Sequence, residues 1–293
     1  HKVLFDIRFP RIILGVLVGI AFGISGAMMQ TLFRNPLADP SLIGVSAGAS
    51  AGVVSFMMLG SFLPLIFTQG ILSYFSLPLS AFLGAVITIA AIYKLATLYN
   101  KVAITIMLLA GIAINSLLGA LIGLFSYVST DEELRSFTFW TMGSLANGEL
   151  KNIMIILPIV VLVCIFAMNK RVELNLLLLG EDEARNIGVN TERLKKQIIL
   201  CVSLAIGVSV AFCGIIGFVG LVVPHISRYI VGSNHKYMLP MSALSGAFIL
   251  IWADAIARTI ISPAELPIGI ITAILGAPFF LFLLIKNKQN TLN

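Results

Sequence analysis

The chain has 293 residues, of which 59% are apolar and 11% are charged, and its formal net charge is +6. Soluble domains carry about 25% charged residues because their surfaces face water. The low charged fraction, with a mean hydropathy of +1.04, excludes an ordinary soluble domain and predicts a chain that lies largely in lipid. The basic residues sit in short loops between apolar runs, a pattern typical of membrane topology that argues against nucleic-acid binding.

Nine apolar stretches are candidates for membrane spans, because a hydrocarbon core about 30 Å thick needs roughly 20 helical residues. They cover residues 11–33, 41–59, 75–98, 102–127, 151–168, 194–213, 215–231, 238–260 and 267–285. The apolar stretch 61–74 contains Pro64 and Gly70 and is predicted to be a loop or a re-entrant segment. The sequence thus predicts an all-α integral membrane protein, a multi-span helical bundle that forms one transmembrane domain over residues 1–293.

The distribution of Lys and Arg predicts the orientation, because cytoplasmic loops are enriched in basic residues. With Lys286 and Lys288 in the cytoplasm, nine spans place the N-terminus outside and thirteen of the 19 basic residues inside. The opposite orientation reverses the ratio. The outside N-terminus opens with the charged run HKVLFDIRFPR, which we expect to follow one further span that this sequence does not include.

Small residues recur at fourfold spacing in three spans, which lets helix backbones approach closely within lipid. The sets, which we expect to pack against other helices, are Gly15, Gly19, Gly23 and Ala27; Gly44, Gly48 and Gly52; and Gly111, Gly119 and Gly123. The glycine-rich segment 214–220 precedes Pro224 and predicts a discontinuous helix of the kind found beside transport pathways. The cysteines lie in apolar runs without metal-ligand or disulfide spacing and are predicted to be packing residues: Cys164, Cys201 and Cys213.

The longest loop on the predicted inner side covers residues 169–193. Its apolar run Leu176–Leu179 ends at Gly180, and the acidic residues 181–183 are typical of the first turn of a helix. Gly188 can end that second helix. The loop therefore predicts two short helices with a right-angle break. An apolar surface beside a membrane favours a docking role, and a solvated connector is the alternative.

The stretch LLLLGEDEARNIGVN resembles the ATPase-docking loop of the FecCD family, the permeases of bacterial importers for iron-siderophores, haem and cobalamin. Residues 8–49, 217–228 and 253–280 resemble further blocks of that family, in the expected order. The resemblance implies a ten-span permease fold, of which this chain resembles the last nine spans. The segment YVSTDEELRSFTFWTMGSLANG at 127–148 is most similar to haem permeases, which implies haem as the cargo, with a siderophore or cobalamin as the alternative.

The same resemblance implies roles for individual residues. Three arginines at the outer ends of spans correspond to those that pair with a substrate-binding protein: Arg8, Arg11 and Arg258. Six residues of the inner loop correspond to the ATPase contact: Leu179, Gly180, Glu181, Ala184, Arg185 and Gly188. Four residues correspond to the cytoplasmic gate of cobalamin permeases: Asn35, Leu37, Ile104 and Thr105.

Structural alternatives stay open for some of these positions. Arg258 lies four residues after Asp254, a spacing at which two side chains on a helix face each other. Asn35 can equally belong to a plain connector. His225 has the chemistry to bind haem iron, but its Val-Pro-His-Ile stretch is generic across the resembled family, so no metal ligand is predicted.

The implied assembly is a homodimer of this chain with two ATPase subunits docked on residues 176–190 and one periplasmic or lipid-anchored binding protein. Its expected location is the lipid bilayer of the bacterial cytoplasmic (inner) membrane. The chain contains no Gly-Lys dipeptide and hence no Walker A loop for nucleotide phosphates. ATP and Mg²⁺ are therefore expected on the separate ATPase, with no cofactor in this chain.

Two other classes of function compete with an ATP-driven permease. Residues 23–26 and 44–48 match short serine-hydrolase patterns, but a serine nucleophile needs a base. The only histidines are His1, His225 and His235, and none lies in the glycine-rich helix that rhomboid proteases use. An ion-coupled secondary transporter is the stronger rival. Such carriers place acidic residues mid-membrane, whereas Asp254 is the only acidic residue within the predicted spans, and the docking loop favours the ATP-driven class.

Overall fold

The computed structural model describes residues 3–59, 71–99, 101–261 and 264–292. Within these ranges the chain is helical except for short connections and one antiparallel hairpin of two short strands. In chain order the elements are η1 (Val3–Arg8), α1 (Phe9–Leu32), η2 (Pro40–Ile43), α2 (Val45–Leu59), α4 (Ile71–Ala96), β1 (Thr97–Leu98), β2 (Lys101–Val102), α5 (Ile104–Val128), α6 (Asp131–Thr141), α7 (Leu150–Asn169), α8 (Arg171–Leu179), α9 (Glu181–Asn186), α10 (Thr191–Cys213), α11 (Val219–Val231), α12 (His235–Thr259) and α13 (Ile268–Leu292).

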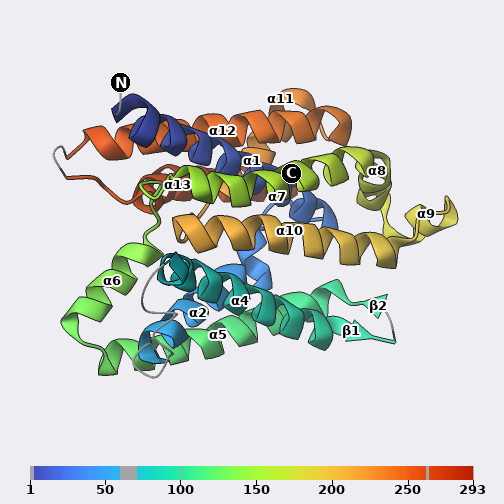
Figure 1. The fold of residues 1–293 in the computed structure, drawn as a ribbon. Coiled ribbons are helices and arrows are strands. Elements are labelled where there is room, and N and C mark those ends of the chain that lie inside the picture. Colours follow the sequence, from blue (N-terminus) through green and yellow to red (C-terminus); the bar gives the residue numbers. More distant parts are fainter. Residues whose placement is uncertain (1–2, 60–70, 100, 262–263, 293) are drawn as a thin grey trace.

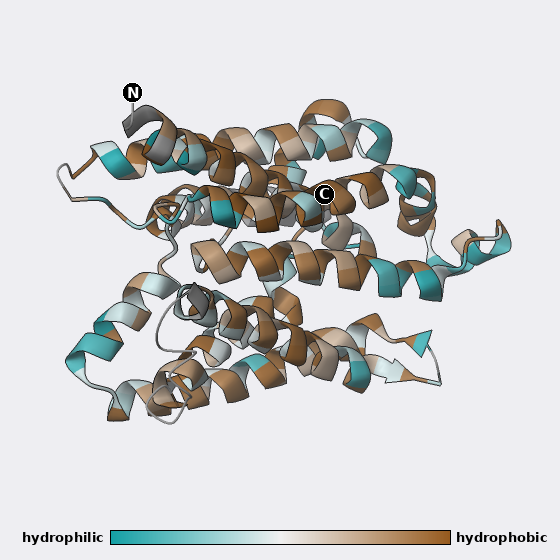
Figure 2. Ribbon diagram, in the orientation of Figure 1, coloured by the Kyte–Doolittle hydropathy of each residue, from teal (hydrophilic) through white to brown (hydrophobic). Residues whose placement is uncertain are grey.

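Nine apolar helices in the described part of the chain correspond one to one with the nine predicted spans. Six of them, α1, α4, α5, α7, α10 and α12, are long and apolar enough to cross a membrane, and α2, α11 and the first part of α13 are shorter. Figure 2 shows apolar residues along the middle of the long helices and hydrophilic residues at their ends. The prediction of a multi-pass α-helical membrane protein is confirmed.

The predicted span at 41–59 is not continuous, which corrects the sequence interpretation. Pro40–Ile43 forms a 3-10 turn, Gly44 has a positive φ of 82°, and α2 begins only at Val45. The side chain of Asp39 caps the turn by accepting a hydrogen bond from the N–H of Ser41 at 2.8 Å. A left-handed residue ends a helical run, so this crossing is split into a turn and a helix of 15 residues.

Three other helix boundaries can be compared with the predicted ones. The chain after Gly214 is irregular until α11 begins at Val219, so the predicted discontinuous helix is confirmed. The span predicted from residue 102 starts as a helix at Ile104, because Lys101–Val102 pairs with β1 instead. Of the predicted loop at 61–74, residues 61–70 lie outside the described residues and the remainder belongs to α4.

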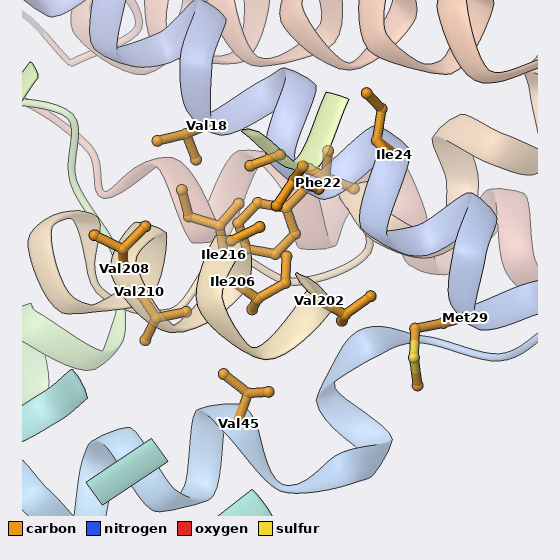
Figure 3. Packing of buried hydrophobic residues seen from close by; sticks show 14 of the residues in the cluster. Val18, Phe22, Ile24, Met29, Val45, Val202, Ile206, Val208, Val210 and Ile216 are labelled. Atoms are coloured by element: carbon orange, nitrogen blue, oxygen red, sulfur yellow. The ribbon is translucent and has the colours of Figure 1, made fainter. Parts of the chain in front are cut away.

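Helix α1 is the centre of the bundle and packs against α7, α10, α11 and α12. Its residues Leu14, Val18 and Met28 have no exposed surface. In Figure 3 the side chain of Phe22 from α1 lies beside Ile206 of α10 and Ile216 of the following break. Helix α10 is as deeply buried as α1 among the candidate spans, so these two helices form the core on which the other elements are arranged.

Small residues explain how closely the helices approach. A Cβ atom at Gly19 of α1 would collide with the carbonyl group of Gly246 in α12, and one at Gly52 of α2 would collide with the carbonyl group of Ser80 in α4. The predicted packing role is therefore confirmed for these two spans. In α5, Gly119 and Gly123 contact no other described helix of this chain, because a Cβ atom at either position would have nothing within 4 Å.

The two ends of the bundle differ. Figure 1 shows α8, α9 and the β1–β2 hairpin at one end, here named the α9 end, and α6 at the opposite end, here named the α6 end. The contact between Thr31 and His235 joins two chain segments that were both predicted inside. The contact of Arg11 with Glu265 joins two segments predicted outside. Each of these two contacts thus joins segments that were predicted on the same side of the membrane.

Candidate functional site

The segment between α7 and α10 folds into two short helices, here named the docking elbow (residues 171–188). Helices α8 and α9 meet at Gly180, which has φ 148° and ψ 155°. Such a φ strongly favours glycine, and a Cβ atom at this position would also collide with the carboxylate of Glu183. The prediction of two short helices that separate at Gly180 is confirmed.

The end of the elbow also follows the sequence prediction. Gly188 has φ 96° and donates its N–H to the carbonyl of Arg185 at 2.9 Å. The next residue, Val189, donates to the carbonyl of Ala184 at 2.9 Å. These two bonds satisfy carbonyl groups at the end of α9, as is common where a glycine terminates a helix.

The elbow has an inner and an outer side. Leu174, Leu177 and Ala184 are buried, whereas Leu179 is 68% exposed and Ile187 is 63% exposed. Beside the exposed leucine, α8 and the α11–α12 connection enclose an open hollow of about 620 Å³. Its lining is Asn175, Leu176, Leu178, Leu179, Arg228, Ser233 and Asn234. Exposed apolar side chains next to a hollow are typical of a surface that binds another protein.

Two charged residues of the elbow face α10. The Glu181 carboxylate lies 2.7 Å from the ammonium group of Lys195, and the Arg185 guanidinium lies 2.9 Å from the Glu192 carboxylate. Sequence reasoning missed Lys195 and Glu192, although their i,i+3 spacing at the start of a helix is a recognisable pairing signal.

The first predicted gate segment is the turn after α1. The side chain of Asn35 accepts the backbone N–H of Leu37 at 2.9 Å, and the N–H of Asn35 donates to the carbonyl of Gln30 at 3.1 Å. Such an Asx turn fixes the backbone locally. Asn35 is exposed and Leu37 is half-buried. Farther along the same turn, burial raises the pKa of the Asp39 carboxyl, against the opposing effect of its hydrogen bonds with Ser41.

The second predicted gate segment is the first turn of α5. Ile104 is half-buried and packs against the core, and Thr105 is exposed. The β1–β2 hairpin leads into this turn. The element that follows the first gate segment, η2, packs against α5, and a Cβ atom at Gly111 would collide with the carbonyl of Leu42.

Arg11, one of the three predicted docking arginines, points into the protein. Its Nε and Nη2 atoms donate to the Asp254 carboxylate at 2.8–3.1 Å, and its Nη1 atom donates to both oxygens of Glu265 at 2.9 and 3.1 Å. The residue is only 8% exposed. Arg11 therefore ties α1 to α12 and to the connection before α13, a role that its sequence position alone does not indicate.

Arg8 and Arg258, by contrast, share an open hollow of about 470 Å³ at the α6 end. Its lining is Phe5, Arg8, Phe9, Ile12 and Arg258. The i,i+4 pair of Arg258 with Asp254 is present, with Nε and Oδ2 separated by 3.1 Å. The side chain of Arg258 is nevertheless 30% exposed and Arg8 is exposed, so both remain available for the predicted docking role, which stays a prediction.

The segment that resembles haem permeases forms a backbone junction. The carbonyls of Met142 and Gly143 accept the N–H groups of Gly269 and Ile268 at 3.0 and 3.1 Å, and the N–H of Ser144 donates to the carbonyl of Cys213 at 2.7 Å. These bonds hold the α6–α7 connection against the α10–α11 break and the start of α13. The segment thus joins three parts of the chain at this junction through backbone hydrogen bonds.

The described residues contain no group of three or more His, Cys, Asp or Glu side chains placed to hold a metal ion. The His225 ring packs edge-on against Phe279, with ring centroids 5.9 Å apart. His235 lies apart from it, and its ring contacts Thr31 and Asn175.

Comparison with known proteins places this architecture in a family. The sequence model of the FecCD transport family matches residues 1–286. The hemin transport system permease protein of Yersinia pestis is 41% identical over 284 residues, which cover 97% of this chain and 83% of the relative. The cobalamin import system permease protein of Halobacterium salinarum is 41% identical over 278 residues, which cover 95% of this chain and 72% of the relative.

Solved structures agree with this assignment. An inward-facing structure assigned to the metal-chelate type of ABC transporter superposes with a TM-score of 0.87 at 34% identity, and the match covers 97% of this chain and 88% of that chain. The PsaBC complex of Streptococcus pneumoniae shares the fold, with a TM-score of 0.64 at 17% identity over 93% of this chain and 88% of that chain. The chain belongs to the FecCD transport family and is a permease subunit of an ABC importer.

Proposed function

We propose that two copies of this chain form the pore of an importer that carries an iron-containing chelate, haem in the first place, across the bacterial cytoplasmic membrane. Two ATPase subunits dock on residues 176–190 at the α9 end, and a periplasmic or lipid-anchored binding protein delivers the cargo at the α6 end. The observation that carries the ATPase role is the docking elbow, with the exposed Leu179 beside a hollow of about 620 Å³.

The homodimer is supported by the open surface of α5. Only 11% of the apolar 18-residue stretch of α5 is buried, compared with 78% of the corresponding stretch of α1. Gly119 and Gly123 lie on this helix with nothing within 4 Å of their Cβ positions. Small residues in a membrane helix favour contact with another helix, because they let the backbones approach. A second copy on α5 meets this condition, and the transport path then runs between the two copies.

Haem is preferred as the cargo because of two similarities. The hemin permease of Yersinia pestis is 41% identical over nearly the whole chain, and residues 127–148 resemble haem permeases most. Cobalamin is the alternative, since the Halobacterium relative has the same identity. No cofactor is assigned to this chain, and ATP with Mg²⁺ is assigned to the ATPase subunits.

The proposed identity of the cargo is tested by measurements of growth and of uptake. A strain without this permease is supplied with haem, a ferric siderophore or cobalamin as the limiting nutrient, and uptake of each labelled compound is measured after the gene is returned. The proposal predicts that the gene restores growth on haem and raises haem uptake at least tenfold. Restored uptake of cobalamin or a siderophore, without haem uptake, contradicts the haem proposal and leaves the importer class intact.

The surroundings of Asp254 argue against an ion-coupled secondary transporter. This carboxylate is held by the guanidinium groups of Arg11 and Arg258 at 2.8 and 3.1 Å. A carboxylate that carries an ion or a proton through a transport cycle must exchange its partner, whereas this one is bound to two fixed cations.

A further inference from the structure

Lys195 of α10 is a buried cation at the α9 end, with a side chain that is only 2% exposed. A buried ammonium group is costly unless it is paired and fully hydrogen-bonded. Its Nζ atom lies 2.7 Å from Glu181, 3.0 Å from Glu192 and 3.0 Å from the carbonyl oxygen of Val102. An ammonium group has three donors, and here each donor has one acceptor.

The three acceptors come from three different elements. Glu181 is the first residue of α9 in the docking elbow, Glu192 lies in the first turn of α10, and Val102 is the last residue of β2. Lys195 is thus the point where the elbow, a core helix and the β1–β2 hairpin meet. Figure 1 shows the hairpin, α9 and the start of α10 together at this end of the bundle.

The hairpin makes a second backbone hydrogen bond to α10, in addition to the bond from Lys195 to the carbonyl of Val102. The second oxygen of Glu192 accepts the N–H of Val102 at 2.8 Å, while the carbonyl of Val102 accepts from Lys195. Both backbone polar groups of Val102 therefore bind side chains of α10, and its own side chain is 3% exposed. Two residues later α5 begins at Ile104, the first residue of the second predicted gate segment.

The elbow is attached to the same cluster at a second point. Arg185, one turn after Glu181, donates to the hydroxyl of Thr191 and to the Glu192 carboxylate, both at 2.9 Å. Charge-assisted hydrogen bonds of this length are roughly twice as strong as neutral ones. Helix α9 has six residues, so these two attachments control how it moves relative to α10.

We propose that Lys195 is a positioning residue that transmits movement of the docking elbow to the start of α5. The inference rests on the proposed function, because an ATPase bound to the elbow must supply the movement. Since one ammonium group holds both Glu181 and Val102, a shift of α9 changes the position of the peptide that leads into Ile104 and Thr105. The cluster is a physical connection of the kind that coupling between distant sites requires.

The test uses the complete transporter, with ATPase and binding protein, in liposomes. Lys195→Met removes the ammonium group and keeps an apolar chain of similar length. The matched control is Lys196→Met, because Lys196 is the next residue of α10 but is exposed. Three quantities are measured: ATPase that co-purifies, cargo transported per ATP hydrolysed, and ATP-dependent cross-linking between copies that carry Thr105→Cys, with the unsubstituted chain as background.

The proposal predicts that Lys195→Met retains the ATPase and continues to hydrolyse ATP, while cargo per ATP falls at least tenfold and the cross-linking no longer responds to ATP. Lys196→Met behaves like the unsubstituted chain. Unchanged transport and unchanged cross-linking in Lys195→Met overturn the inference. Loss of the bound ATPase overturns it too, because Lys195 would then support the docking surface itself.

A second variant covers the case in which Lys195→Met does not fold. Glu181→Gln weakens the bond to α9 but leaves Lys195 bound to Glu192 and Val102, and the same loss of cargo per ATP is expected. Normal coupling in Glu181→Gln contradicts the inference. Failure of the proposed function itself is recognised by a different result: the unsubstituted chain then neither retains an ATPase nor transports cargo with ATP.

Discussion

The ring of His235 in α12 lies 2.7 Å from the hydroxyl oxygen of Thr31 at the end of α1. Its other ring nitrogen lies 2.7 Å from the side-chain oxygen of Asn175 in α8. Because an amide oxygen only accepts, Nδ1 carries the proton and donates to Asn175. The Thr31 hydroxyl also lies 2.8 Å from the carbonyl oxygen of Ala27, so its one proton is shared between Ala27 and Nε2. This one side chain connects α8 of the docking elbow with the helix that leads to the first predicted gate segment.

We predict that His235→Leu destabilises the protein. The ring is fully buried, and its loss removes one hydrogen bond each from Thr31 and Asn175, at a cost of about 0.5–1.5 kcal/mol per bond. Thr31 keeps the Ala27 carbonyl, and Asn175 keeps the backbone N–H of residue 235. The measurement is the thermal unfolding midpoint in detergent, compared with that of Lys236→Met, which changes the exposed neighbour. An equal midpoint for both variants contradicts the prediction.

Arg11→Ala is predicted to lower the stability of the fold, and not only to weaken docking of the binding protein. Among the described residues, it leaves the buried Asp254 with Arg258 as its one remaining ion-pair partner and removes the ion-pair partner of Glu265. Removal of one partner from a buried ion pair costs about 3–5 kcal/mol, so the unfolding midpoint should fall clearly. Arg8→Ala, an exposed residue three positions earlier, should leave it unchanged. If Arg11→Ala unfolds normally and only weakens binding-protein docking, its structural role is wrong.

The combined change Arg8→Glu and Arg258→Glu is predicted to weaken docking of the binding protein and to abolish transport. Both side chains line the same hollow at the α6 end, and rim charges act mainly by orienting a partner of opposite charge. Titration of the binding protein onto reconstituted transporter should show at least a tenfold higher Kd. Arg135→Glu makes one Arg-to-Glu substitution on α6 at this end, which is half of that charge change. An equal loss in Arg135→Glu would indicate a general charge effect and remove the assignment.

Gly180→Ala is predicted to release the ATPase. At φ 148° an alanine is strained by roughly 1–3 kcal/mol, so the joint between α8 and α9 changes to relieve that strain. The Glu183 carboxylate, at the end of a flexible side chain, moves away from the new Cβ. Co-purified ATPase should fall at least tenfold, with the permease still folded. Asn186→Ala, at an exposed position of the same elbow, should retain the ATPase. Full retention in Gly180→Ala would argue against docking on the elbow.

Hydropathy predicted the membrane spans well, because a run of about 20 apolar residues has few other stable environments. It did not predict the interruption at Gly44, since the surrounding residues are as apolar as the helix that follows. The elbow could be predicted in detail because its signals are local: an apolar run, Gly180, an acidic first turn and Gly188.

The polar interior was not predictable in the same way. Arg11 and Asp254 are 243 positions apart, and Lys195 and Val102 are 93 positions apart. Glu192 lies three residues before Lys195 and four before Lys196, so either lysine has the spacing for an ion pair, and the local sequence does not indicate which one becomes buried. Which charged side chain becomes buried depends on the neighbours that the fold provides, and a single sequence does not show these neighbours.

We propose that this permease obtains its energy from a separate ATPase. The most direct measurement is cargo uptake by liposomes that contain the permease and its binding protein, with or without the ATPase and ATP, and with or without a proton or sodium gradient. We predict accumulation only when both ATPase and ATP are present, whatever the gradient. Accumulation driven by a gradient in liposomes without the ATPase would contradict the claim.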